Sequence, residues 1–143
     1  MISADDYQHL PLIKVVGISA SGKSTLVQAL RRRGYHARPV SQEHSNVGDL
    51  WKQFGLPKIL VYLDVRLDIQ RQRRPDVEWS EKAHFDEIEK LKQALENADL
   101  RIDTSGLPPA KVLQVALAFL RQHKIRHSKE TLPPIPSTGS FAP

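Results

Sequence analysis

The sequence predicts an α/β fold, a three-layer α/β/α sandwich in which helices cover both faces of a mainly parallel sheet of about four strands. Apolar runs of strand length alternate with helical patterns four times along the 143-residue chain. The links between them are short, which favours parallel strands joined by right-handed crossovers. The run at 58–65 is apolar almost throughout, as expected of a strand that is covered on both faces.

The first predicted strand, residues 12–16, leads into a glycine-bounded loop and then a helical pattern that stops at Gly34. The loop from Gly17 to Ser24, GISASGKS, fits G-x-x-x-x-G-K-[ST] at every fixed position. In such a loop successive backbone N–H groups surround a phosphate, and the helix N-terminus adds the positive end of its dipole. The motif therefore predicts a phosphate-binding loop.

Each fixed position of this motif has a chemical role. Gly17 and Gly22 supply backbone freedom that a Cβ atom would restrict. Lys23 is expected to reach the β- and γ-phosphates, and the Ser24 hydroxyl is expected to ligate Mg²⁺. The predicted nucleotide-binding residues here are Gly17, Ile18, Ser19, Ala20, Ser21, Gly22, Lys23, Ser24 and Thr25.

Three further strands follow from the sequence pattern. Residues 36–40 form a short second strand, in which Pro39 favours an edge position. Residues 58–65 form the third strand and 100–103 the fourth. Because ligands of parallel α/β sheets bind at the carboxyl ends of the strands, the loops after all four strands are expected to meet at one site.

Four further helices are predicted, and they differ in length and in composition. An amphipathic helix is predicted over 47–54, an arginine-rich helix over 66–74, a long helix over 80–97, and a last, well-buried helix that reaches about residue 122. Ser80 is the expected N-cap of the long helix. The apolar faces of the first and third of these helices consist of Val47, Leu50, Trp51 and Phe54, and of Phe85, Ile88, Leu91 and Leu95.

Composition limits the class of protein. The length suits one domain, here residues 1–123, followed by a proline-rich segment, 124–143, predicted to be a flexible tail. The chain has no cysteine, no apolar run long enough to span a bilayer and no basic leader, so the cytoplasm is the expected compartment. A net charge of +5 favours anionic partners. No basic stripe interleaved with aromatic residues occurs, so nucleic acid is not favoured, and the oligomeric state stays open.

The chain resembles the small P-loop kinases of metabolites and nucleotides, the adenylate-kinase-like group that includes shikimate, gluconate and dephospho-coenzyme-A kinases. Three segments carry the resemblance: VVGISASGKSTLVQAL, ILVYLDVRLDIQRQRRP and ADLRIDTSGLPPAKVLQVALAFL. It implies a P-loop NTPase fold and Mg²⁺-dependent transfer of the γ-phosphoryl group of ATP, favoured over GTP, to a small-molecule acceptor. Only residues 35–57 separate the first helix from the LDV strand, so the acceptor-binding region is shorter than in that group.

Such a reaction also needs a carboxylate that holds the metal or acts as general base, and two residues are candidates for it. Asp64 ends an apolar strand, the Walker B arrangement, and would hold the metal through water. Glu43 lies in the SQEHS loop after the second strand, where the resemblance implies a general base or a metal-side carboxylate. The predicted metal residues are therefore Ser24, Asp64 and Glu43, with the choice between the two acids left open.

The resemblance also implies a lid and an adenine-side loop. Arg71, Arg73 and Arg74 are the lid candidates, since a guanidinium can neutralise charge on a transferred phosphoryl group or stack on adenine. Thr104 and Gly106 would line the adenine. The predicted catalytic residues are Lys23, Glu43, Arg71, Arg73 and Asp64, and the predicted nucleotide contacts beyond the loop are Arg74, Thr104 and Gly106.

A second class of function fits the same sequence. The shortened acceptor region is also typical of a nucleotide-binding module, or a weak NTPase, that acts through a protein partner. An enzyme acting on nucleic-acid ends is a third possibility, although the chain lacks a clear basic groove.

Overall fold

The computed structural model describes residues 4–136 and has an α/β fold built on one four-stranded sheet. Every neighbouring pair of strands is parallel, and the strand order is β2-β1-β3-β4. The predicted class and number of strands are confirmed. β2 lies at an edge of the sheet, as Pro39 indicated. The strands are β1 (Leu12–Gly17), β2 (His36–Pro39), β3 (Ile59–Asp64) and β4 (Leu100–Asp103).

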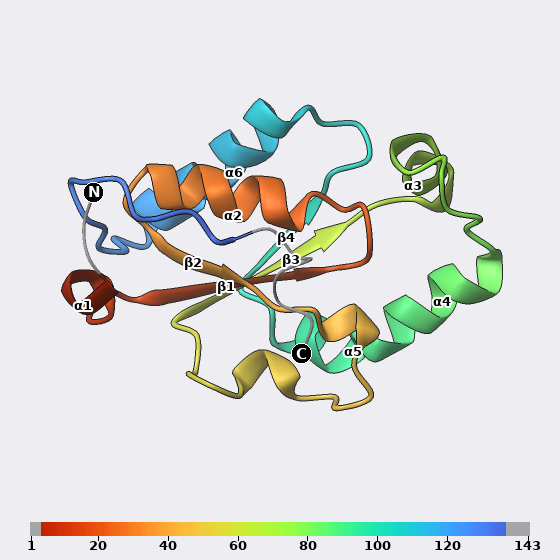
Figure 1. Cartoon of the computed structure of the whole chain (residues 1–143), viewed down its shortest axis with the longest axis horizontal. Coiled ribbons are helices and arrows are strands. Elements are labelled where there is room, and N and C mark those ends of the chain that lie inside the picture. Colours follow the sequence, from red (N-terminus) through yellow and green to blue (C-terminus); the bar gives the residue numbers. More distant parts are fainter. Residues whose placement is uncertain (1–3, 137–143) are drawn as a thin grey trace.

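Helices occupy the connections between the strands and cover both faces of the sheet, an arrangement compatible with a three-layer sandwich (Figure 1). Most begin and end near the predicted positions. Their bounds are α1 (Ala4–Tyr7), α2 (Lys23–Arg32), α3 (Leu67–Arg73), α4 (Glu81–Lys90), α5 (Lys92–Asn97) and α6 (Pro109–Gln122), with short 3₁₀ turns η1 (Gln42–His44) and η2 (Leu50–Lys52).

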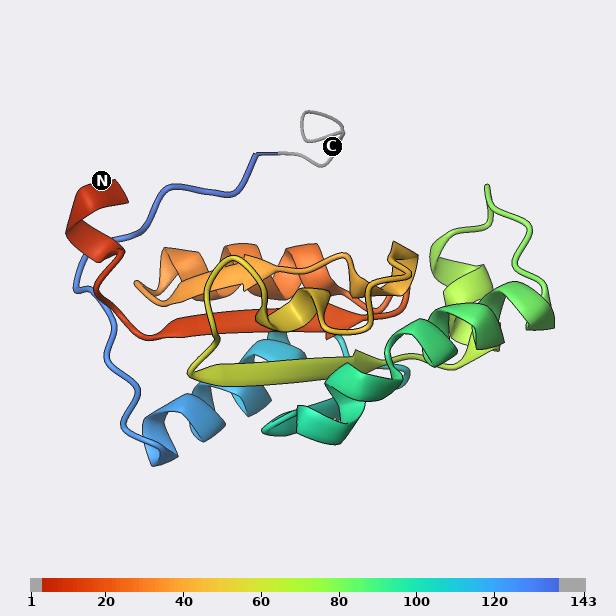
Figure 2. The ribbon, with the colours of Figure 1, turned by 90° about the horizontal axis from the view of Figure 1, so that it is seen from below.

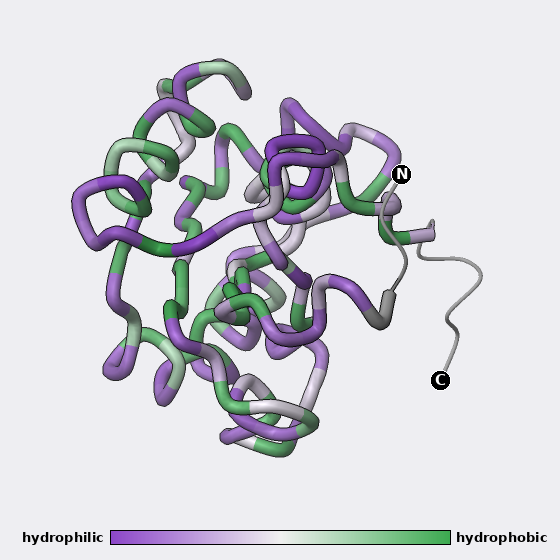
Figure 3. The backbone as a smooth tube through the Cα atoms, turned by 90° about the vertical axis from the view of Figure 1, so that its left-hand side faces the viewer, coloured by the Kyte–Doolittle hydropathy of each residue, from purple (hydrophilic) through white to green (hydrophobic). Residues whose placement is uncertain are grey.

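Two hydrophobic clusters hold these layers together. The larger lies between the sheet and the pair α2 and α6, and it includes Leu26, Leu30, Val61, Val112 and Leu117. The smaller lies on the other face, beneath η2 and α5, and it includes Val16, Trp51, Tyr62, Leu91 and Ala94. Figure 3 shows hydrophilic residues over many of the peripheral turns, in keeping with a core confined to the two faces of the sheet.

Helix α2 ends where the sequence indicated, at Gly34, which has a φ of +88°. A Cβ atom at this position would lie 1.9 Å from the carbonyl oxygen of Ser128. Gly34 therefore ends the helix and also lets a distant segment of the chain approach it closely.

That segment, residues 125–135, differs from the flexible tail that its composition predicts. It runs back along the outside of α2 (Figure 2), and its Leu132 side chain is 1% exposed. The Ser128 N–H donates to Gly34 O at 2.8 Å, and the Leu132 N–H donates to Arg31 O at 2.9 Å. Arg31, itself buried, donates from Nε to Pro133 O at 2.6 Å. The part of the predicted tail from 137 onward lies outside the described residues.

The helix predicted over 47–54 is reduced to the single turn η2, which is a correction. Trp51 is buried as expected, but Phe54 is 89% exposed. The Gln42 side chain donates to Val47 O at 2.6 Å and accepts from the Trp51 N–H at 2.9 Å, so it takes backbone groups that a helix would use. Phe54 and Gly55, both with positive φ, then turn the chain away.

The long helix predicted over 80–97 is divided at Leu91 into α4 and α5. Ser80 is its N-cap, with the hydroxyl accepting from the Ala83 N–H at 3.0 Å, so the predicted start is confirmed. The predicted buried face is confirmed at Leu91, and Ile88 and Leu95 are partly buried against the smaller hydrophobic cluster. The prediction is wrong at Phe85. Phe85 is 63% exposed, whereas His84 and Glu87 face inward.

Helix α6 begins at Pro109 but is not buried all round, since Val115 is 41% exposed. Its buried face consists of Val112, Ala116, Leu117 and Leu120. Within residues 4–136, none of the helices is both long enough and apolar enough to cross a bilayer.

Candidate phosphate-binding site

The candidate site lies at the carboxyl ends of the four parallel strands. β1 runs directly into the loop Gly17–Ser24, called the 17–24 loop below, and β2 is followed by η1, which carries Glu43. Asp64 is the last residue of β3, and Thr104 follows the last residue of β4. Because all strands point the same way, these four positions lie along one edge of the sheet, as the sequence predicted.

Lys23 is the centre of the site. Its ammonium group donates to the Gly17 carbonyl oxygen at 2.7 Å and forms an ion pair with the Glu43 carboxylate. The Lys23 side chain is 13% exposed and that of Glu43 is 4% exposed, so the pair is well shielded from solvent. One carboxylate oxygen of Glu43 faces Lys23, whereas the other, Oε1, is buried without a hydrogen-bond partner among the described residues.

The 17–24 loop is held in a tight turn. The Ser21 N–H donates to Ile18 O at 3.1 Å, and Ala20 and Gly22 both have positive φ. At Gly17 a Cβ atom would lie 2.6 Å from both Leu63 O and Ser21 Oγ, so only glycine fits between the loop and β3. Ser21 Oγ is a second buried polar atom without a partner in the described part of the chain.

Arg73 ties α3 to this loop. Its guanidinium donates to the carbonyl oxygen of Ala20 at 2.9 Å and to the carbonyl oxygen of Thr104 at 2.6 Å. It also donates to the Thr104 hydroxyl at 3.0 Å, and that hydroxyl donates to Ser21 O at 2.8 Å. Arg73 and Thr104 therefore brace the outer wall of the loop.

A pocket of about 380 Å³ adjoins the loop on the side of α6. Its polar side consists of loop residues 20–22, Thr25, Thr104 and the two arginines Arg73 and Arg74. Its apolar side is formed by Leu26, Leu107, Pro109 and Val112. An apolar wall beside a polar one suits a ligand with both an apolar and a polar part, and the volume lies within the range of small-molecule sites.

The other predicted lid and adenine-side residues contribute less. The Arg71 guanidinium is turned away and donates to Trp79 O at 2.9 Å. Arg74 lines the pocket but pairs with Asp76 at 2.8 Å, and this contact raises the pKa of the arginine. Gly106 does not line the pocket, although Leu107 beside it does. Of the three lid candidates, only Arg73 contacts the loop.

The two candidate acids occupy different surroundings. Glu43 pairs with Lys23, whereas the carboxylate of Asp64 pairs with Arg101 and lines a separate cavity together with Arg66. The backbone of Asp64 still supports the site, because its carbonyl oxygen accepts from the Thr104 N–H at 2.8 Å. Of the two candidate acids, Glu43 therefore has its carboxylate beside the Lys23 ammonium, and Asp64 does not.

Three residues at the site were not anticipated from the sequence. Glu87, on α4, accepts from both the N–H and the hydroxyl of Ser19, each at 2.8 Å. Gln70, on α3, donates to Ser19 O at 2.7 Å and contacts His84 Nδ1 at 2.9 Å. One helix face, made of two polar and two apolar residues at helical spacing, is buried: His84, Glu87, Leu91 and Ala94. This spacing was the signal in the sequence from which the inward position of Glu87 could have been predicted.

The site has groups suited to a nucleotide and Mg²⁺. The Ser24 hydroxyl is exposed beside Lys23, and no atom lies within 4 Å of the position of a Cβ at Gly22, so the loop opens to solvent there. The two orphaned atoms, Ser21 Oγ and Glu43 Oε1, remain available for hydrogen bonds. Within residues 4–136, no group of three or more His, Asp and Glu side chains could hold a metal ion by itself.

Comparison with known protein families finds no family model that matches this chain, and comparison with curated proteins finds no significant match.

Proposed function

We propose that this protein has a P-loop NTPase fold and is an ATP- and Mg²⁺-dependent phosphotransferase that acts on a small molecule. The observation that carries the proposal is the position of Lys23. Its ammonium lies between the Gly17 carbonyl and the Glu43 carboxylate, at the end of a loop whose sequence is G-x-x-x-x-G-K-S. The expected cytoplasmic location belongs to this proposal.

The loop residues would bind the phosphates of the nucleotide. Backbone N–H groups at the start of α2 point along the helix dipole toward an anion, and Lys23 adds a full positive charge. The Ser24 hydroxyl would hold Mg²⁺, which when bound neutralises negative charge on the phosphate oxygens. The base and ribose would lie in the pocket between the loop and α6.

Arg73 and Glu43 would act on opposite sides of the transferred group. Arg73 contacts the loop at Ala20, from where its guanidinium can turn toward a phosphate and stabilise developing charge. Glu43 has one buried carboxylate oxygen that lacks a partner within residues 4–136, and this oxygen is suited to accept the proton of an acceptor hydroxyl. An acceptor would then approach from η1 and α4, where His44 lies 3.6 Å from Glu43 and 3.8 Å from Glu87.

One observation favours the alternative, a nucleotide-binding module or weak NTPase that acts through a partner. The hydroxyl, N–H and carbonyl of Ser19 are all bonded, to Glu87 and Gln70. These bonds hold α3 and α4 against the loop on the side from which an acceptor must come. A kinase needs this contact to open, whereas a binding module does not.

The test is ATP turnover with Mg²⁺, measured alone and in the presence of pooled metabolites and nucleosides. A phosphotransferase shows turnover that one pool stimulates, and Lys23→Ala and Arg73→Gln each lower it by about 10²-fold or more. Arg32→Gln, which changes an exposed arginine at the far end of α2, is the matched control and leaves turnover unchanged.

Other outcomes separate the two readings. Tight binding of Mg·ATP without stimulated turnover would favour the binding module. Absence of any ATP or GTP binding by the folded protein would contradict both readings.

A further inference from the structure

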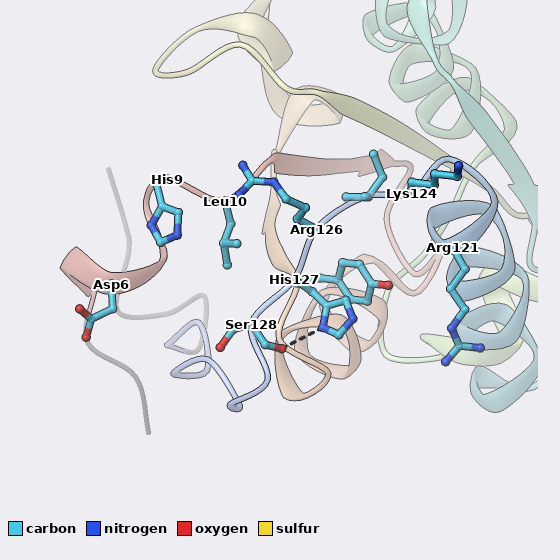
Figure 4. A pocket seen from close by; sticks show the side chains of 10 residues that line it. Asp6, His9, Leu10, Arg121, Lys124, Arg126, His127 and Ser128 are labelled. Carbon is cyan, nitrogen blue, oxygen red and sulfur yellow. Dashed lines mark hydrogen bonds between the residues drawn. The ribbon is translucent and has the colours of Figure 1, made fainter.

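A second cavity, of about 700 Å³, is seen from close by in Figure 4. It is formed by Leu10, just before β1, by Tyr35, just before β2, and by the segment that follows α6. The parallel strands begin at this edge of the sheet, and the candidate phosphate site lies at the opposite edge, where they end. The two sites share no lining residues. Nothing in the proposed function accounts for this cavity.

The floor of the cavity is apolar and aromatic. Leu10, Tyr35 and Ile125 are all buried and line it. The ring of His127 lies against that of Tyr35, with a distance of 4.7 Å between ring centroids. Such a floor suits a flat apolar group of a ligand.

The rim of the cavity is cationic. Arg121, Lys124 and Arg126 line it, and no side-chain hydrogen bond or ion pair joins any of them to another described residue. Figure 4 shows Arg121 and Lys124 toward one end of the cavity and Asp6 at the other, so an anion would bind at the Arg121 end.

Tyr35 lines the same cavity, close enough to Arg121 for that charge to act on its phenol. Tyr35 is 2% exposed, and its hydroxyl, which forms no hydrogen bond to another described residue, is not among the atoms shielded from solvent. Burial raises the pKa of this phenol, against the opposing effect of the Arg121 charge, so the hydroxyl is a neutral donor near pH 7.

We propose that this cavity is a second ligand site, which binds a small phosphate monoester with an aromatic or apolar group. The ring would lie on the floor beside Tyr35 and His127. Arg121 and Lys124 would hold the phosphate by charge-assisted hydrogen bonds, and the Tyr35 hydroxyl would donate to the same phosphate. The site is independent of the 17–24 loop.

The test uses phenyl phosphate as the probe and the backbone amide signals of the ¹⁵N-labelled full chain as the readout. The experiment is done on Lys23→Ala, to weaken phosphate binding at the loop, and on the unmodified chain. We expect saturable shifts of the Tyr35 and Ile125 amides in both proteins. Shifts of Gly22 and Ser24, which report on the loop, are followed separately, so failure at one site is distinguishable from failure at the other.

Variants then test the named contacts. The double change Arg121→Gln with Lys124→Gln should weaken phenyl phosphate binding at least tenfold, and Tyr35→Phe should weaken it severalfold while keeping the ring. Lys111→Gln, an exposed lysine at the other end of α6, is the matched control and should leave it unchanged. Amide spectra of each variant establish that it is folded.

Several results would overturn the proposal. One is the absence of saturable shifts at Tyr35 and Ile125. Another is equal binding of phenol or benzoate, which lack the phosphate. A third is binding of an RNA oligonucleotide at these amides where phenyl phosphate does not bind, which would make the rim a polyanion surface instead.

Discussion

Glu87 accepts two hydrogen bonds from Ser19, one from the backbone N–H and one from the hydroxyl, and thereby fixes α4 to the 17–24 loop. The carboxylate comes from a position 68 residues further along the chain and is largely buried. Hydrogen bonds to a buried charged acceptor are among the stronger ones in proteins. The conformation of the loop therefore depends on a helix that carries none of the predicted phosphate-binding residues.

Glu87→Ala should lower the free energy of unfolding by about 1–3 kcal/mol, because the Ser19 N–H and hydroxyl lose their acceptor. Nucleotide affinity should fall as well, since Ser19 belongs to the loop. Urea denaturation and nucleotide titration measure the two effects. Glu89→Ala, an exposed glutamate on the same helix, is the control and should change stability by less than about 0.5 kcal/mol. Equal effects of the two changes would contradict this role of Glu87.

Glu43→Gln should separate nucleotide binding from turnover. The change removes a negative charge that pairs with Lys23 next to the proposed phosphate position, so ATP should bind about threefold to tenfold more tightly. Turnover should fall by about 10²-fold, because glutamine cannot accept the acceptor proton.

Titration calorimetry and a coupled ATP assay measure the two quantities for Glu43→Gln. Glu96→Gln, an exposed carboxylate on α5, is the control. A large loss of ATP affinity in Glu43→Gln would instead show that Glu43 holds Lys23 in its binding position.

Leu132→Ala should lower the free energy of unfolding by about 2–5 kcal/mol, the usual cost of truncating a fully buried leucine. Leu132 is buried against α2 in a segment whose backbone also bonds to Arg31. Leu56→Ala, at a leucine that is 72% exposed, should cost less than about 0.5 kcal/mol. Chemical denaturation measures both. If the two changes cost the same, residues 125–135 do not pack on α2 in solution.

The sequence was sufficient for the features that local patterns determine. β1 and β3 each follow from a short apolar run, and the end of α2 follows from Gly34. The motif places Lys23 at the carboxyl end of β1, and the position of Glu43 after β2 places it at the same edge. Each of these predictions needs only residues close together in the chain.

The features that the sequence did not predict depend on contacts between distant segments. The inward face of α4 contains Glu87 because that carboxylate bonds to Ser19, and apolar periodicity does not register such a contact. Residues 125–135 have too little apolar content to predict a packed segment, yet carbonyl oxygens such as Pro133 O accept hydrogen bonds from α2. In both cases specific polar contacts, rather than hydrophobic pattern, position the segment.

Stability should fall as the pH drops below about 6.5, and His36 should account for part of the loss. Its imidazole is buried and its Nδ1 has no partner among the described residues. Burial lowers the pKa of His36, an effect that a backbone contact with Leu10 opposes and the charges of Arg31 and Arg38 reinforce. The unfolded chain, with an ordinary histidine pKa, therefore binds a proton that the folded chain does not.

The contribution of neutral His36 to the free energy of unfolding is fully present above pH 6.5. It decreases as the pH falls from there toward the lowered pKa of the folded state, by at most about 1.4 kcal/mol per pH unit. Urea denaturation at pH 7.5 and at about pH 5.5 measures it. His36→Phe keeps a ring to pack edge-on against Tyr7 and should lose less stability between the two pH values than the unmodified protein does. His9→Gln, at an exposed histidine, should lose as much as the unmodified protein. If His36→Phe and the unmodified protein lose the same amount, the pH dependence arises from other groups.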